Sequence, residues 1–228
     1  MTRNIRLLLT ARLFFNFSVS MQAILLGWRM YELTKDPLYL GFIGLAEAIP
    51  ALGFALFAGL IVDNSSPLTT YRFVLLGSLL SGLVLFFSQS TLVELSVHQQ
   101  VLALFCSSLM TGLSRSFSQP SMFAMIPRLV SKEQFSKSNA WLTATLQVAR
   151  ISGPAVGGLV YGLYGLHAGS TIICVTLIAA LVATMFMAPM PKILRQNPNR
   201  ESISEKLLSG ARFVYRHPIL FPALTLDM

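Results

Sequence analysis

The sequence has little charge of either sign. Only 11% of its 228 residues are Asp, Glu, Lys or Arg, whereas soluble domains carry about 25% charged residues. Hydrophobic residues make up 54% of the chain, and the mean hydropathy is +0.66. A soluble domain of this size cannot bury so much apolar surface, so we expect lipid to surround much of the chain. This excludes an ordinary soluble enzyme, a disordered chain and a secreted disulfide scaffold.

Cysteine and histidine are also scarce, with two and three residues respectively. Cys106 and Cys174 both lie in apolar runs, where a thiol behaves as a small buried hydrophobic side chain. His98, His167 and His217 do not stand at metal-ligand spacing with other His, Cys, Asp or Glu residues. The sequence also has no Gly-rich phosphate-binding loop followed by Lys. We therefore expect neither a metal site nor a cofactor.

Six apolar segments are long enough to cross a bilayer, which takes about 20 helical residues. The pattern predicts an all-α membrane protein whose residues 1–189 form a six-helix transmembrane bundle. The predicted spans are 7–31, 40–62, 72–93, 100–125, 138–164 and 168–189.

Basic residues outnumber acidic ones and give a net charge of +8. They lie between the apolar runs instead of clustering on one soluble face, so we expect no nucleic-acid partner. Outside the runs, twelve of them fall on one side of the membrane and only Lys35 falls on the other. The positive-inside rule then places the N-terminus and the tail on the cytoplasmic side of a cell membrane. We expect this membrane to be a bacterial inner membrane.

The tail differs from the bundle in composition. Residues 190–218 are rich in charge and interrupted by proline, which predicts a cytoplasmic linker with a short amphipathic helix on the membrane surface. Residues 219–228 start a new apolar run that is too short to span. We expect this run to be a truncated seventh helix, and the chain to be the front part of a longer protein.

Five ionisable residues fall inside the predicted spans. A charged side chain at this depth costs several kcal/mol of insertion free energy, so each one indicates a structural or functional role. Arg29 lies near the outer end of the first span, where its head can reach the lipid headgroups. Arg12 lies about one turn in from the cytoplasmic side, so reaching the headgroups and facing a pore are both open. Glu47 is the only acid in a span, and it either pairs with an arginine or carries a proton. Arg115 and Arg150 lie close to mid-span.

Each of these two central arginines belongs to a polar stripe with helical spacing. The stripes read Ser108, Thr111, Arg115, Ser118 or Gln119, Met122 and Asn139, Thr143, Gln147, Arg150, Pro154, Tyr161. Two polar faces in a lipid-buried bundle turn inward. They form either an interhelical hydrogen-bond network or the wall of a cavity that binds substrate or controls proton movement. The candidate site residues are Arg115, Glu47, Arg150, Gln147, Gln119 and Arg12.

Three parts of the sequence resemble the major facilitator superfamily of secondary transporters. Gly59-Leu-Ile-Val-Asp63 resembles the family's Gly-x-x-x-Asp signature after the second helix. Gly153-Pro154-Ala-Val-Gly157-Gly158 resembles the antiporter motif of proton-driven exporters, and Arg115 resembles the fourth-helix arginine of the same group. The stretches Thr34–Gly41 and Gln147–Pro154 are similar to the branch that includes the enterobactin exporter.

The resemblance implies the N-terminal half of a twelve-helix fold, whose other half is missing here. It further implies alternating access and export of a drug-like or siderophore-like small molecule in exchange for protons. Gly59 and Asp63 would act in gating, and the antiporter-motif glycines in close helix packing. One departure concerns the gate, because Asn64-Ser-Ser-Pro stands where the family places basic residues after Asp63.

Two other classes remain as alternatives. A six-helix intramembrane enzyme such as a protease needs a Ser nucleophile and a His base at the same membrane depth, and no histidine lies mid-span. A complete six-helix subunit without transport activity does not account for the apolar run after Pro218. We therefore expect a transporter and not an enzyme, with lipid, a small-molecule substrate and protons as its partners.

Overall fold

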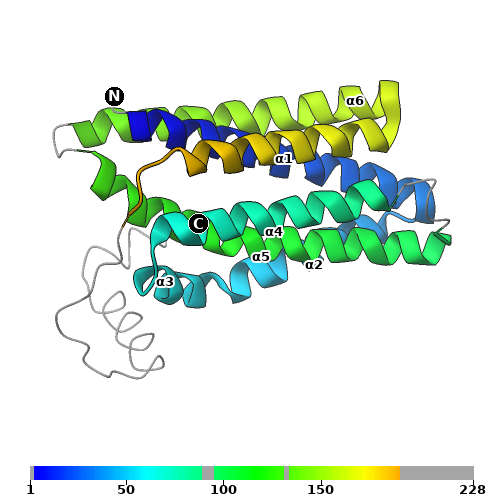
Figure 1. Ribbon diagram of the computed structural model, residues 1–228. Coiled ribbons are helices and arrows are strands. Elements are labelled where there is room, and N and C mark those ends of the chain that lie inside the picture. Colours follow the sequence, from blue (N-terminus) through cyan, green and yellow to red (C-terminus); the bar gives the residue numbers. More distant parts are fainter. Residues whose placement is uncertain (1–2, 89–94, 131–133, 191–228) are drawn as a thin grey trace, which may run out of the picture. The chain divides into compact units, whose positions relative to one another are not determined.

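The computed structural model describes residues 3–88, 95–130 and 134–190. In these ranges the regular elements are all α-helices, so the expected all-α fold class is confirmed there. Figure 1 shows the helices α1 (Arg3–Thr34), α2 (Leu38–Gly53), α3 (Ala55–Asp63), α4 (Pro67–Phe87), α5 (Val97–Leu129) and α6 (Phe135–Met185). The predicted linker at 190–218, except for Met190, and the predicted seventh helix at 219–228 lie outside the described residues.

Four helices, α1, α4, α5 and α6, are long and apolar enough to cross a membrane. Helices α2 and α3 would together make a fifth span. The described helices therefore do not reproduce the six predicted spans one for one. Two of those spans are joined within α6, and another is divided between α2 and α3.

Helix α6 contains two helical parts on either side of Gly165. It has 51 residues, which at about 1.5 Å per residue far exceeds the ~30 Å hydrocarbon core of a bilayer. Gly165 has a φ of 75° and a ψ of −177°, which is not helical and which glycine reaches because it has no Cβ. Figure 1 shows the chain folding back there. We call residues 135–164 the first arm and residues 166–185 the second arm; they correspond to the predicted spans 138–164 and 168–189.

The predicted span 40–62 is bent where α2 meets α3. The axes of Leu38–Gly53 and Phe57–Asp63 differ by 48°. Pro50 lies one turn before the bend, and a proline inside a helix removes the N–H that would bond the carbonyl four residues earlier. Proline is a common cause of such kinks, and it explains why one apolar run contains two helices.

Two helices begin earlier than predicted because of their first residues. Helix α4 begins at Pro67, and proline is favoured in the first turn, where its missing N–H has no partner to lose. Helix α5 begins at Val97, directly after Ser96. The side chains of Ser96 and Gln99 form a reciprocal capping box that satisfies the free backbone N–H groups of this end.

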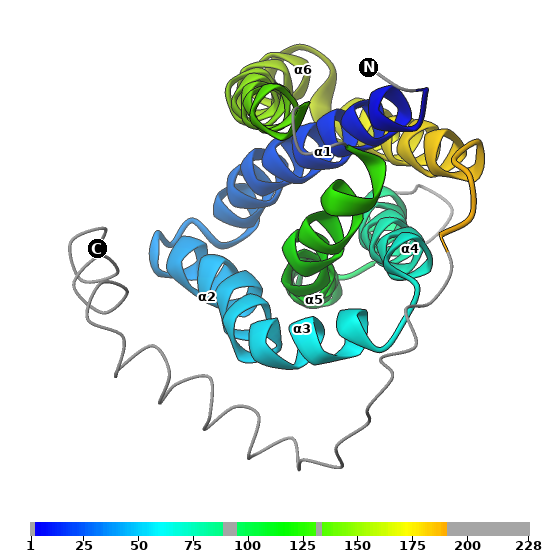
Figure 2. The same ribbon diagram turned by 90° about the vertical axis from the view of Figure 1, so that its left-hand side faces the viewer.

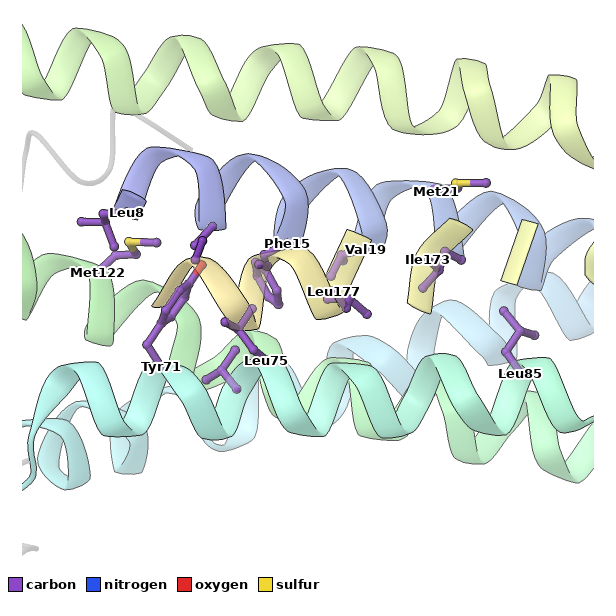
Figure 3. Packing of buried hydrophobic residues seen from close by; sticks show 14 of the residues in the cluster. Leu8, Phe15, Val19, Met21, Tyr71, Leu75, Leu85, Met122, Ile173 and Leu177 are labelled. Carbon is purple, nitrogen blue, oxygen red and sulfur yellow. The ribbon is translucent and has the colours of Figure 1, made fainter. Parts of the chain in front are cut away.

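A hydrophobic core joins α1, α4 and the second arm of α6. Helix α1 packs chiefly against α6, and α5 packs against α4 and α2. Figure 2, which looks along the bundle, shows α1 beside both arms of α6 and α5 between α2 and α4. Figure 3 shows core residues from all three helices facing one another: Phe15, Val19, Leu75, Ile173 and Leu177.

A buried polar network fixes α1 against α4 and α5. The side-chain amide of Gln22 donates to the hydroxyl oxygens of Ser81 at 2.7 Å, of Ser107 at 2.8 Å and of Thr111 at 3.1 Å. All four residues are almost fully buried. Because lipid offers no replacement partners, this network holds three helices in one relative register.

Replacing Gln22 by Leu should lower the thermal stability of the full-length protein. The substitution leaves the hydroxyls of Ser81 and Thr111 without their shared amide donor, at a cost of about 1–2 kcal/mol. Thermal unfolding of purified protein in detergent measures the effect. Gln147→Leu is the matched control, because Gln147 is exposed. Equal stability of the two variants would show that the network does not hold the helices together.

Candidate functional site

A cavity of about 680 Å³ lies between α1, α2, α5 and the first arm of α6. It brings together four residues proposed from the sequence, Glu47, Arg115, Gln119 and Arg150, together with Pro154 of the antiporter motif. Arg12 and Gln147 are not part of its lining. The lining also includes three polar residues that the sequence analysis did not propose as site residues: Asn16, Ser20 and Ser118.

Glu47 and Arg115 form an ion pair across the cavity wall, from α2 to α5. The Glu47 side chain is 15% exposed and the Arg115 side chain 48% exposed, so the arginine is the partner that reaches open space. Of the two roles open to Glu47, pairing with an arginine is therefore the arrangement present in this structure.

The close approach of α2 to α5 at this pair depends on Gly112. A Cβ atom at Gly112 would lie 2.2 Å from the backbone oxygen of Glu47 and 2.8 Å from Cγ of Pro50. Ser108, one turn earlier on α5, donates its hydroxyl to the backbone oxygen of Ile43 at 2.8 Å. Gly112 was missed because its neighbour is 65 residues away in sequence, and no local pattern indicates that contact.

The polar stripe of α5 serves both of the roles that the sequence left open. Ser108 and Thr111 are buried in hydrogen bonds between helices. Ser118 and Gln119 line the cavity together with Arg115. The N-terminal part of the stripe therefore fixes the helix, and its continuation forms cavity wall.

Arg150 enters the cavity from the first arm of α6. In the part of the chain that the structure describes, its guanidinium makes no ion pair. Arg12 of α1 is 9% exposed and lies close enough to Arg150 for the two charges to repel each other. The Arg12 side chain is thus nearly buried and is not part of the cavity lining, and its two possible roles stay predictions.

The antiporter-motif glycines differ in what they face. A Cβ atom at Gly153 would lie 2.8 Å from the backbone oxygen of Phe17, and one at Gly157 would lie 3.1 Å from Cγ of Met21. Both glycines therefore let the first arm of α6 approach α1 closely. At Gly158 a Cβ atom would meet no described atom within 4 Å. Close packing at Gly158 therefore stays a prediction, because no described segment approaches this position.

Gly59 and Asp63 lie on α3 and do not line the cavity. A Cβ atom at Gly59 would meet no described atom within 4 Å. Asp63 is exposed, and among residues 3–88, 95–130 and 134–190 it forms no ion pair. This pair of residues is thus separate from the Glu47–Arg115 site.

A second polar cluster lies near the C-terminal end of α1. Arg29 pairs with Glu32 at 3.2 Å and donates to the side-chain oxygen of Gln100 at 2.9 Å. The hydroxyl of Tyr161 donates to the Glu32 carboxylate at 2.6 Å. The cluster links α1 to α5 and to the first arm of α6, so Arg29 has protein partners in addition to any headgroups it reaches.

Among the described residues, no group of three or more His, Cys, Asp or Glu residues is placed to hold a metal ion. Cys174 is buried, but Cys106 is exposed. The expectation that both thiols are buried is wrong for Cys106, because this residue lies on the outward face of α5, beside the buried Ser107.

Comparison with known proteins assigns the family. The chain belongs to the Major Facilitator Superfamily, whose family model matches residues 8–228. A crystal structure of a peptide transporter POT in complex with alafosfalin has the same fold, with a TM-score of 0.68 at 16% identity, over 100% of this chain and 47% of that one.

Three curated relatives have sequences similar to this chain. An uncharacterized MFS-type transporter of Sinorhizobium fredii is 24% identical over 90% of this chain and 51% of its own length. The enterobactin exporter EntS of Shigella dysenteriae is 27% identical over 53% of this chain and 28% of its own length. The macrolide efflux protein A of Enterococcus faecalis is 28% identical over 59% of this chain and 46% of its own length. The chain thus spans about half, or less, of the length of these relatives.

Gly153→Ala should destabilise the full-length protein, whereas Gly158→Ala should not. The added methyl group at position 153 meets the α1 backbone, and such overpacking costs about 1–3 kcal/mol. At position 158 the methyl group would meet no described atom within 4 Å, and alanine favours a helix interior. Thermal unfolding of the two variants, side by side, measures the difference. Equal losses for both would contradict the assignment of Gly153 to the α1 contact.

Proposed function

We propose that the full-length protein is a secondary active exporter that exchanges a small organic molecule for protons by alternating access. In this proposal the chain is the N-terminal half of a twelve-helix carrier with six membrane spans, and the two arms of α6 are the fifth and sixth. Its N-terminus and the 190–218 linker lie in the cytoplasm. Family membership, relatives named as exporter and efflux protein and a cavity of about 680 Å³ support it.

The observation that carries the proposal is the Glu47–Arg115 ion pair on the cavity wall. Protonation removes the negative charge of Glu47, so the attraction between the two side chains is lost and Arg115 is released toward the cavity. A substrate that binds Arg115 and a proton that binds Glu47 then alter each other's affinity, as linkage requires.

Gly59 and Asp63 have a different role in this proposal. They lie beyond the cavity lining, on the short helix α3 that follows the bend after Pro50. A hinge at a helix end is where a domain movement concentrates its change of backbone angle. We assign Asp63 to the closing of the cytoplasmic side and not to substrate contact.

An intramembrane enzyme is the less favoured function. The described cavity lining contains no histidine, and His98 and His167 lie near the ends of α5 and of the second arm of α6. Among the described residues, a serine nucleophile in the cavity would thus lack a histidine base within reach.

The test of proton exchange uses everted membrane vesicles that contain the full-length protein, with enterobactin and erythromycin as probes. Glu47→Gln and Arg115→Ala should each reduce probe uptake driven by a pH gradient at least about tenfold. Arg115→Lys should also be severely impaired, because lysine lacks the planar guanidinium fork. Arg6→Ala, at an exposed position outside the cavity, is the control. Normal uptake by Arg115→Ala at normal expression would remove the pair from the mechanism.

Asp63→Asn should slow turnover and leave the affinity for substrate nearly unchanged. The reason is that Asp63 lies outside the cavity, so loss of its charge alters the movement and not the binding site. The initial rate of probe uptake against probe concentration separates kcat from KM. A large increase in KM with normal kcat would place Asp63 in the binding site instead.

A further inference from the structure

The formal charges of the cavity lining do not cancel. Glu47 and Arg115 neutralise each other in their ion pair. Arg150 also lines the cavity, and no described acid pairs with it. The described lining therefore carries one uncompensated positive charge, located on the first arm of α6.

Arg12 adds a second cation beside this one. On α1 the cavity is lined by Phe15, Asn16 and Val19, and Arg12 lies three and four residues before the first two, so it continues the same helical face. Its side chain is nearly buried, and it makes neither an ion pair nor a hydrogen bond with the described residues. Its electrostatic neighbours are Arg150, which repels it, and Tyr71.

Neutral donors stand next to these cations. Tyr71 is fully buried, and its hydroxyl has no hydrogen-bond partner among the described residues. Figure 3 shows its ring extending from α4 toward α1. There it packs edge-on against Phe15, with the two ring centroids 6.2 Å apart. Asn16 donates to the backbone oxygen of Arg12, which leaves its second amide hydrogen for a ligand.

An arrangement of this kind is unfavourable without an anion. Arg150 is exposed to the cavity and Arg12 is nearly buried, and two guanidiniums that repel each other with no anionic partner among the described residues are unfavourable together. A carboxylate or a similar two-oxygen anion removes both problems, because arginine binds such groups with two parallel hydrogen bonds. The apolar residues of the same wall, such as Phe15 and Val19, suit an organic body attached to that group.

We propose that Arg12 and Arg150, with Asn16 and Tyr71 beside them, form an anion-binding corner of the cavity, and that the transported molecule is an organic anion held there by its acidic group. The inference rests on the proposed function, since it names the class of molecule that the cavity carries. It also separates the three arginines by role. Arg115 pairs with Glu47, whereas Arg12 and Arg150 hold the acidic group of the cargo.

The test uses the full-length protein and two dyes that share a xanthene core. Fluorescein is an anion and rhodamine 6G is a cation. Binding to purified protein is followed by fluorescence anisotropy, and flux is followed in proteoliposomes with an imposed pH gradient. Wild-type protein should bind fluorescein more tightly than rhodamine 6G. Arg150→Gln should weaken fluorescein binding about tenfold or more, as loss of a charged hydrogen-bond donor does, and should leave rhodamine 6G binding unchanged or stronger.

Two further variants separate a ligand role from a structural one. Arg12→Met removes a charge that has no described partner, so it should raise the thermal stability of the ligand-free protein and abolish its stabilisation by fluorescein. A purely structural arginine would show the opposite, a loss of stability in the ligand-free state. Arg6→Gln removes an exposed cation from the same helix and should leave both dye affinities as in wild type.

The outcomes distinguish this inference from the proposed function. Flux driven by the pH gradient but indifferent to dye charge and to Arg150→Gln overturns the anion-binding corner and leaves the exporter in place. Fluorescein binding that depends on Arg150, without gradient-driven flux, overturns the exporter and leaves the corner. Wild-type protein with no preference for fluorescein over rhodamine 6G also overturns the anion-binding corner.

Discussion

Every polar group inside this bundle depends on a partner supplied by the protein or its cargo, because the surrounding lipid supplies none. Gln22 meets the requirement with three hydroxyls from α4 and α5, and Glu47 meets it with Arg115. Both arrangements use α5, which thereby positions α1, α2 and α4 around itself. Arg12 and Arg150 have no ionic partner among the described residues, and the buried hydroxyls of Tyr71, Ser78 and Ser121 also lack a hydrogen-bond partner there. The two arginines differ from these neutral groups in carrying a charge, and we assign the binding wall to that charge.

The charge of the cargo determines how membrane voltage acts on the proposed exchange. An exporter that releases a monovalent anion for each proton admitted moves the equivalent of two positive charges inward, and each contributes about 2.3 kcal/mol per 100 mV. A monovalent cation exchanged for one proton moves no net charge. The proposed anionic cargo therefore predicts a carrier that uses both the voltage and the pH gradient, whereas a monovalent cationic cargo would use the pH gradient alone.

The sequence analysis predicted those features that composition and helical spacing determine. Apolar runs located α1, α4, α5 and both arms of α6, and the stripe on α5 placed Arg115 and Gln119 on one face. The rest depends on what a distant segment offers to that face. Spacing alone does not distinguish Thr111, which meets Gln22, from Ser118, which meets the cavity. Nor does it distinguish Gly157 from Gly158, since only the position of α1 gives the two glycines different surroundings.

The two helix pairs around the cavity are held by different means, and this difference sets where movement begins. Helix α1 and the first arm of α6 meet through Gly153 and Gly157, whose contacts involve the backbone and residues packed against it. This contact does not change with protonation. Helices α2 and α5 meet at Gly112 and at the Glu47–Arg115 pair, whose attraction depends on the charge of Glu47. In the proposed exchange, proton uptake by Glu47 would loosen the α2–α5 wall against the α1–α6 wall, so the proposed anion-binding corner would keep its shape while the opposite side of the cavity moves.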